Sequence, residues 1–188
     1  MNAIDSIKVW DPLVRLFHWV LVAAFFIAYL SGDEWLRLHV YMGYVVLALL
    51  VFRLLWGFVG PPYARFSSFV YSPRTTLTYI RDVMTGKAAR YIGHNPAGGA
   101  MVIMLLLGLL VTTVSGLMLY GAEAWQGPLA AWMKNSSDET IDIIEDVHEF
   151  CADFTLFLVV VHVCGILWES VLHRENLVLS MFTGRKRP

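Results

Sequence analysis

The stretch VHEFCADFTLFLVVVHVCGILWESVL (Val147–Leu172) decides the fold class, because it is a long apolar segment that carries two histidines. The fourteen residues from His148 to His162 span ~21 Å along a helix axis at the usual helical rise. Both side chains fall on one face, since the rotation between them is only about 40° short of four full turns. Histidine is costly inside a membrane unless it has a partner or a function, so the pattern predicts a functional transmembrane helix.

The composition is that of an integral membrane protein. Hydrophobic residues make up 57% of the 188 residues, charged residues make up 15%, and the mean hydropathy is +0.60. Four segments are long and apolar enough to cross a hydrocarbon core of ~30 Å, at about 13–30, 38–58, 97–120 and 147–172. The first is expected to be a permanent helix, because no small-residue cleavage site follows it. The sequence therefore predicts an all-α, four-helix membrane bundle that forms a single domain over residues 1–188.

The distribution of lysine and arginine predicts the orientation in the membrane. Only Arg37 and Lys134 fall on one side of the four predicted helices. The other side holds twelve: Lys8, Arg15, Arg53, Arg65, Arg74, Arg81, Lys87, Arg90, Arg174, Arg185, Lys186 and Arg187. By the positive-inside rule, both termini are expected in the cytoplasm. The outer loop before the fourth helix is acidic and could steer a basic partner.

Four histidines form two pairs at matching depths in this topology. His18 and His162 are expected toward the cytoplasmic side, and His39 and His148 toward the outer side. A zinc site would need three or four ligands at one level, whereas two histidines can hold a planar iron porphyrin from both faces. The sequence therefore predicts two haem b groups. Two axial histidines per iron favour outer-sphere electron transfer over oxygen chemistry at the metal.

Small and basic residues near these histidines are consistent with such sites. Gly43 and Gly165 lie on roughly the same helical faces as His39 and His162 and leave room for a macrocycle, although glycine also serves ordinary helix packing. Three arginines near the membrane surfaces could pair with haem propionates or a quinone head group, or else extend to lipid phosphate. These are Arg15, Arg37 and Arg53.

Two further histidines have weaker claims to a functional role. His94, in GHNP (Gly93–Pro96), precedes the third helix, and His173 follows the fourth. Both are expected to be solvated or to cap a helix. His94 retains an alternative as a contact for a quinone or a proton.

Local signals predict three helix starts. Ser72 and Pro73 suit the cap and first position of a short interfacial helix that extends to Met84. Asn95 and Pro96 mark the start of the third long helix. Ser136 and Glu139 fit a capping box, so the fourth helix is expected to begin before its apolar part and to continue as one rod.

Several motifs resemble the prokaryotic cytochrome b561 superfamily, nearest the b-type cytochrome subunit of nickel-iron hydrogenases and its stand-alone relatives. The motifs are VRLFHW (Val14–Trp19), the stretch Arg37–Gly60, GHNPAGG (Gly93–Gly99) and VHEFCADFTLFLVVVHVCG (Val147–Gly165). The resemblance implies that His18, His39, His148 and His162 bind two haems b. It also implies electron exchange between a periplasmic redox partner, either a cytochrome c or a hydrogenase-like protein, and the membrane quinone pool.

Two other functions stay open at this point. The compact chain, the pair His148 and Glu149 and the basic C-terminus also resemble a branch of stand-alone superoxide oxidases, which pass an electron from superoxide to ubiquinone. A plain membrane anchor for a soluble redox enzyme is the third alternative. Whether the chain is itself an enzyme is therefore left open, as is a homodimer. The expected partners are membrane lipid, quinone and a redox protein, with no nucleic acid.

Overall fold

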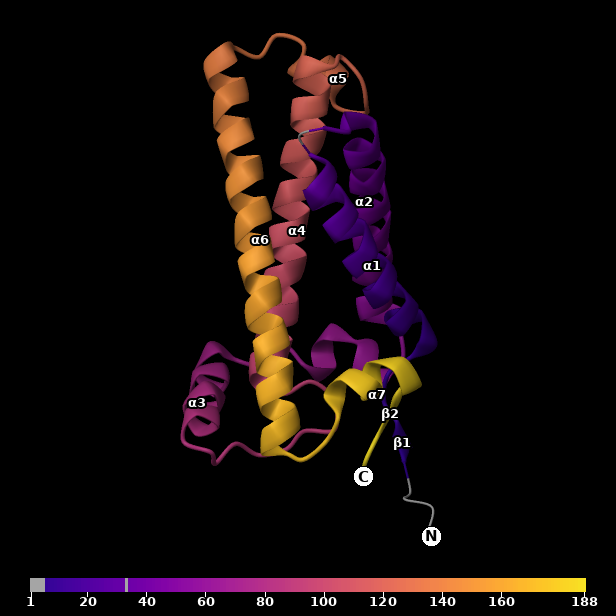
Figure 1. The fold of residues 1–188 in the computed structure, drawn as a ribbon, viewed down its shortest axis with the longest axis vertical. Helices are drawn as coiled ribbons and strands as arrows, with labels where there is room; N and C mark the ends of the chain where they lie inside the picture. The colour runs from indigo at the N-terminus through magenta and orange to yellow at the C-terminus, as the bar shows by residue number, and fades with distance from the viewer. Residues whose placement is uncertain (1–5, 33) are drawn as a thin grey trace. The chain divides into compact units, whose positions relative to one another are not determined.

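The computed structural model describes residues 6–32 and 34–188, and long helices dominate it (Figure 1). The four helices long and apolar enough to cross a membrane are α1 (Pro12–Ser31), α2 (Leu36–Val59), α4 (Pro96–Glu123) and α6 (Asp138–Leu172). Each predicted apolar segment lies inside one of them. The predicted all-α, multi-pass membrane fold is confirmed.

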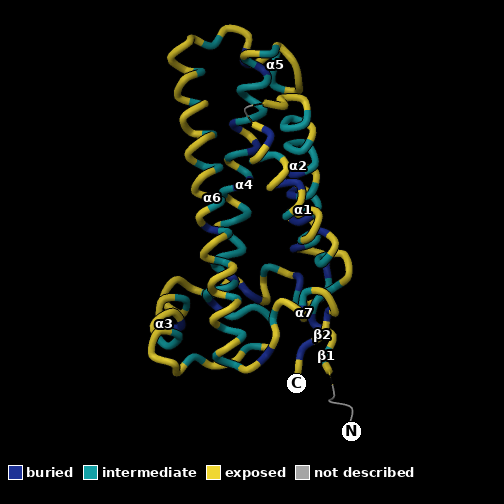
Figure 2. Tube along the Cα trace, in the orientation of Figure 1, coloured by how far each residue is buried: buried dark blue, intermediate teal, exposed yellow. Residues whose placement is uncertain are grey.

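Few residues of the long helices are buried by the protein itself. The buried share of the most apolar window is 22% in α2 and 11% in α6. Figure 2 shows these helices mostly in the colours of intermediate and exposed residues. Because their exposed side chains are largely apolar, these surfaces suit lipid rather than water.

Contacts along the chain divide it into two compact units. Unit 1 consists of Met1–Trp19, Phe52–Met104 and Leu158–Pro188, and unit 2 of Val20–Val51 and Leu105–Phe157. Each long helix contributes residues to both units. His18 and His162 belong to unit 1, whereas His39 and His148 belong to unit 2. Each predicted histidine pair therefore lies within one unit.

Unit 1 contains the short helices that follow α2. Two 3₁₀ turns, η1 (Pro62–Ala64) and η2 (Phe66–Ser68), lead to α3 (Pro73–Met84). Ser72 caps α3 by accepting a hydrogen bond from the Thr75 N–H at 3.2 Å, with Pro73 in the first turn, so the predicted helix and its cap are confirmed. Asn95 likewise accepts a bond from the Gly98 N–H at 2.7 Å, which confirms the predicted start of α4.

The two ends of the described chain meet in unit 1. A two-stranded antiparallel ribbon pairs β1 (Ile7–Lys8) with β2 (Arg185–Lys186), which follows α7 (Leu177–Thr183) (Figure 1). Gly184, between α7 and β2, has φ +78°, a left-handed conformation that glycine adopts without strain. The sequence analysis did not predict this ribbon.

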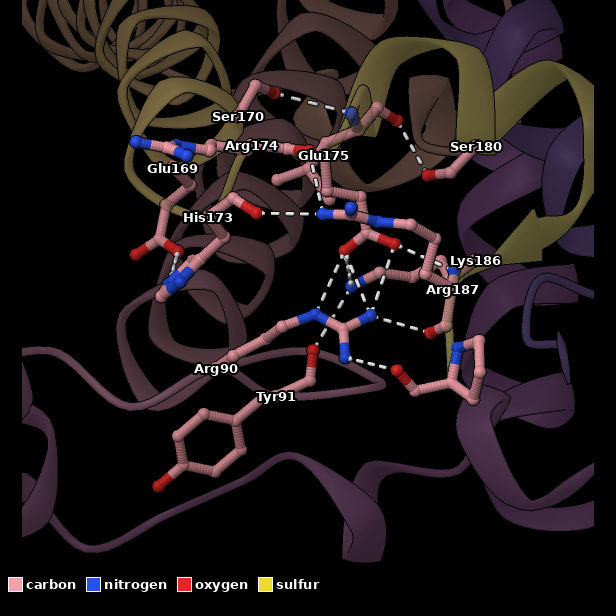
Figure 3. Close-up of polar contacts among 12 residues, drawn as sticks. Arg90, Tyr91, Glu169, Ser170, His173, Arg174, Glu175, Ser180, Lys186 and Arg187 are labelled. Carbon is pink, nitrogen blue, oxygen red and sulfur yellow. Dashed lines mark hydrogen bonds and ion pairs between the residues drawn. The ribbon is translucent and has the colours of Figure 1, made fainter. Parts of the chain in front are cut away.

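A buried carboxylate fixes the C-terminal segment (Figure 3). Glu175 is 7% exposed and accepts bonds from Arg90 at 3.2–3.3 Å and from the Arg187 N–H at 2.9 Å. Lys186 Nζ lies 3.6 Å from its Oε2. These contacts join the segment before α4 to the residues after α6.

Unit 2 contains the short helix α5 (Ala130–Met133) and the first part of α6. The predicted continuous rod is confirmed, since α6 extends over 35 residues. The predicted capping box is wrong, because the cap is Ser137, whose Oγ accepts a bond from the Thr140 N–H at 3.3 Å. Ser136 contacts Met133 Sδ instead.

Candidate functional site

Two histidines from different helices lie close together in unit 2. The ring centroids of His39, on α2, and His148, on α6, are 5.9 Å apart, with ring planes at 73°. Two imidazoles on opposite sides of one metal, at metal–nitrogen distances of about 2 Å, place their ring centres roughly 6 Å apart. The observed separation leaves room for one metal ion between the two rings.

Backbone carbonyls set the orientation of both rings. His39 Nδ1 lies 2.9 Å from the Ala28 carbonyl oxygen, and His148 Nδ1 lies 2.9 Å from that of Thr112 and 3.2 Å from Ser115 Oγ. A carbonyl oxygen only accepts, so each Nδ1 carries the hydrogen and each Nε2 keeps its lone pair. Metal-ligating histidines typically hold the second nitrogen in this way. The donor set in unit 2 therefore fits an axial histidine pair.

Helix α4 supplies the close packing behind His148, although it carries no histidine. A Cβ added to Gly116 would lie 2.8 Å from His148 Cε1, closer than side chains tolerate. Gly116 was not among the site residues predicted from the sequence. The signal that could have found it is the cluster of small and polar residues TTVSG (Thr112–Gly116) within an otherwise apolar span.

An apolar cavity of about 90 Å³ adjoins the pair. Both histidines line it, together with residues of α1, α2, α4 and α6 such as Phe25, Val46 and Leu109. Gly43 lies on the same lining, and a Cβ there would meet nothing within 4 Å. The space expected beside Gly43 is therefore present, and its apolar walls suit a hydrophobic macrocycle.

The other pair, His18 on α1 and His162 on α6, lacks, among the described residues, the hydrogen bonds to backbone carbonyls that hold the pair in unit 2. Both side chains are half-buried and belong to unit 1. His18 packs edge-on against Trp19 at 4.8 Å, and its Nδ1 is buried without a hydrogen-bond partner. Gly165, within α6, is exposed, and a Cβ there would meet no described atom within 4 Å, so the macrocycle space expected beside it stays a prediction.

The three predicted arginines have different surroundings. Arg53 is only 3% exposed, and its Cζ lies 4.9 Å from the Phe66 ring centre, so the alternative of a side chain extended to lipid phosphate is wrong for this residue. Arg15 donates through Nη1 to the Phe182 carbonyl oxygen, while its Nε is buried without a partner. Arg37 is exposed.

The expectation of solvated or capping roles for His94 and His173 is wrong. The His94 ring packs against Trp10 at 4.8 Å and Phe69 at 4.7 Å, with its Nδ1 buried. Burial, and then the positive charge of Arg53, lowers the pKa of His94 to about 3, so its ring is neutral at neutral pH. His173 Nε2 lies 3.1 Å from Glu169 Oε2, a contact one helical turn back that the local sequence could have suggested.

Histidine pairs, rather than larger ligand clusters, characterise both units. Over residues 6–32 and 34–188, no three side chains of histidine, cysteine, aspartate or glutamate converge as a metal site. Two histidines from opposite helices suit a metal whose remaining coordination comes from a macrocycle.

The chain is similar to known proteins over nearly its whole length. The sequence model of a family described as prokaryotic cytochrome b561 matches residues 9–184. The chain is 25% identical to a probable Ni/Fe-hydrogenase B-type cytochrome subunit of Rhizobium leguminosarum bv. viciae, over 97% of this chain and 89% of the relative. Proteins with the same description from Cupriavidus necator (25% identical, 97% of this chain and 88% of the relative) and Azotobacter vinelandii (27%, 95% and 88%) are also similar.

Proposed function

Because the chain belongs to the prokaryotic cytochrome b561 family, we propose that it is a di-haem b-type cytochrome that transfers electrons between a redox protein and the membrane quinone pool. His39 and His148 would be the axial ligands in unit 2, and His18 and His162 those in unit 1. Haem b supplies one-electron redox chemistry when it is bound. The observation that carries the proposal is the His39–His148 pair. The two ring centroids are 5.9 Å apart, and both Nδ1 atoms bond backbone carbonyl oxygens.

The residues around the unit 2 pair would hold ligands and exclude water. The Thr112 carbonyl oxygen fixes the tautomer of His148. It also raises the basicity of the His148 Nε2 atom, which makes this atom a stronger metal ligand. The apolar lining of the cavity keeps polar solvent away from the pair. Two histidines per iron leave no open coordination position, which suits outer-sphere electron transfer.

A hydrogenase-like protein is the partner that the comparisons favour. The three relatives above are described as cytochrome subunits of Ni/Fe-hydrogenases, and each alignment covers nearly the whole of this chain. The start of α6 exposes acidic residues, including Asp142, Glu145 and Asp146, which suit a basic surface on the partner. A periplasmic cytochrome c with a basic surface would suit the same acidic segment. The predicted orientation gives a bacterial inner-membrane protein with this acidic segment outside.

The haem content of the purified protein tests the proposal. A pyridine haemochrome assay should give two haems b per chain, and His162→Ala should leave one. His173→Ala is the matched control and should keep both, since His173 contacts Glu169 rather than another histidine. Retention of both haems in the His162→Ala protein would contradict the ligand assignment.

A further inference from the structure

A buried positive charge in unit 1 lacks a counter-charge. Arg53 is 3% exposed on α2, and its Nη1 is buried without an acceptor. Among residues 6–32 and 34–188, no carboxylate lies within ion-pair distance of it. A guanidinium stays protonated in proteins, and a buried charge without a partner is strongly destabilising. Arg53 therefore requires an anion that the described residues do not provide.

The aromatic rings beside Arg53 do not meet this requirement. Its Cζ lies 4.9 Å from the Phe66 ring centre and 5.7 Å from that of Phe69, which are cation–π distances. Such contacts use the face of the guanidinium group. Nη1 lies at the edge of the group, and its N–H bonds still lack an acceptor among the described residues.

A second unpaired nitrogen lies against the same ring. His94 packs on Phe69 with ring centres 4.7 Å apart, and its Nδ1 is buried without a partner. The positive charge of Arg53 also disfavours protonation of His94 and so lowers its pKa. Two elements of unit 1, α2 and the segment before α4, thus each bring an unsatisfied nitrogen close to Phe69.

We propose that Arg53 and His94 together bind a carboxylate, and that, if the proposed function holds, this carboxylate is a propionate of the haem between His18 and His162. A neutral acceptor, such as a quinone carbonyl, would accept a hydrogen bond but would leave the charge of Arg53 uncompensated. A carboxylate balances that charge and accepts from both residues. Arg53 and His94 are then positioning residues for that haem, and the charge of Arg53 favours its reduced state.

Potentiometric titration of the purified, haem-loaded protein tests this assignment. In Arg53→Gln the equilibrium constant for reduction of one haem should fall about tenfold, which is 59 mV for a one-electron couple. The other haem should be unchanged. Arg53→Lys, which keeps the charge, should shift the same haem by much less. Arg81→Gln, an exposed arginine of α3 in the same unit, is the matched control and should shift neither.

His94 is tested separately by the rate at which haem is lost to an excess of an apo-globin acceptor. His94→Leu removes the donor and should speed the loss of one haem several-fold, whereas His94→Gln keeps a donor and should speed it less. If Arg53→Gln does not accumulate, the shift in Arg53→Lys and the haem loss in His94→Leu decide the question.

Unchanged potentials in an Arg53→Gln protein that retains two haems would overturn the proposal. A rise in the KM for quinone with unchanged potentials would also overturn it, since that result would assign the site to quinone. Failure of the proposed function itself would look different: the wild-type protein would lack two haems, or His162→Ala would keep both.

Discussion

The histidines of unit 2 bond backbone carbonyls, whereas unit 1 contains buried nitrogens without partners among the described residues, His18 Nδ1 among them. His39 and His148 each bond a backbone carbonyl through Nδ1 at 2.9 Å. His18 Nδ1 is buried without a partner, as is Nη1 of Arg53. The comparison shows that unit 2 fixes ring tautomer and orientation through backbone carbonyls, while the described residues of unit 1 leave buried nitrogens unsatisfied.

The largest expected effect is the loss of one haem when a histidine of one pair is replaced. His148→Ala should remove one haem and leave the other, because each pair lies within its own unit. His18→Ala should remove the opposite haem. The pyridine haemochrome assay gives the number lost, and the potential of the surviving haem identifies which one it is. Loss of both haems in either variant would show that the pairs are not independent.

A methyl group placed against His148 should weaken only the site in unit 2. In Gly116→Ala the new Cβ would lie 2.8 Å from His148 Cε1, so the ring must move away from the Thr112 carbonyl. Haem affinity at this site should fall by roughly 10–100-fold, the usual cost of disturbing a residue that orients a ligand. Titration of the haem-depleted protein with haemin measures it.

Val114→Ala on the exposed face of α4 is the control and should bind haemin normally. An unchanged affinity in Gly116→Ala would show that the bond to Thr112 is not needed to orient His148. Equal weakening of both sites would instead indicate a general disturbance of α4.

Loss of the contacts that Glu175 makes with Arg90, Lys186 and Arg187 should lower the stability of unit 1 alone. Burial by itself raises the pKa of Glu175, but bonds from Arg90 and Arg187 and the charge of Lys186 outweigh it, so the net pKa lies below the ordinary value. This stabilisation is complete above the unfolded-state pKa and is lost as the pH falls through the folded one. Glu175→Gln should cost about 1–3 kcal/mol at neutral pH, the usual range for a lost bond to a charged group.

Thermal unfolding in detergent, followed by limited proteolysis of the C-terminal segment, measures this effect. The difference between Glu175→Gln and wild type should shrink as the pH falls through the lowered folded-state pKa of Glu175, because the wild-type carboxyl then becomes protonated. A difference that does not change with pH would exclude a contribution from the charge. Haem binding in unit 2 should not change.

The smallest effect is expected at Ser115. Its Oγ lies 3.2 Å from His148 Nδ1, but the Thr112 carbonyl oxygen at 2.9 Å remains when the hydroxyl is removed. Ser115→Ala should therefore lower haem affinity in unit 2 by less than tenfold, below the usual range for losing such a partner. A loss as large as that in Gly116→Ala would show that the hydroxyl, not the carbonyl, orients the ring.

Most of the fold was predictable because its signals are local. The four apolar segments, the continuous fourth helix and the caps at Ser72 and Asn95 follow from hydropathy and from residues within one helical turn. The cap at Ser136 was misplaced by one residue, since Ser136 and Ser137 carry the same hydroxyl group. The ribbon of β1 and β2 was missed because its strands are two residues long and come from opposite ends of the chain.

The sequence by itself determined a four-helix membrane protein with histidines in pairs, since hydrophobicity and helical periodicity are properties of neighbouring residues. Only the tertiary structure decided which carbonyl oxygens bond His39 and His148, that Gly116 admits the His148 ring, and that Arg53 and His94 pack on the same phenyl ring. These contacts join residues from eleven to thirty-six positions apart on different segments. Helix packing brings such residues together, and no local pattern in the chain specifies it.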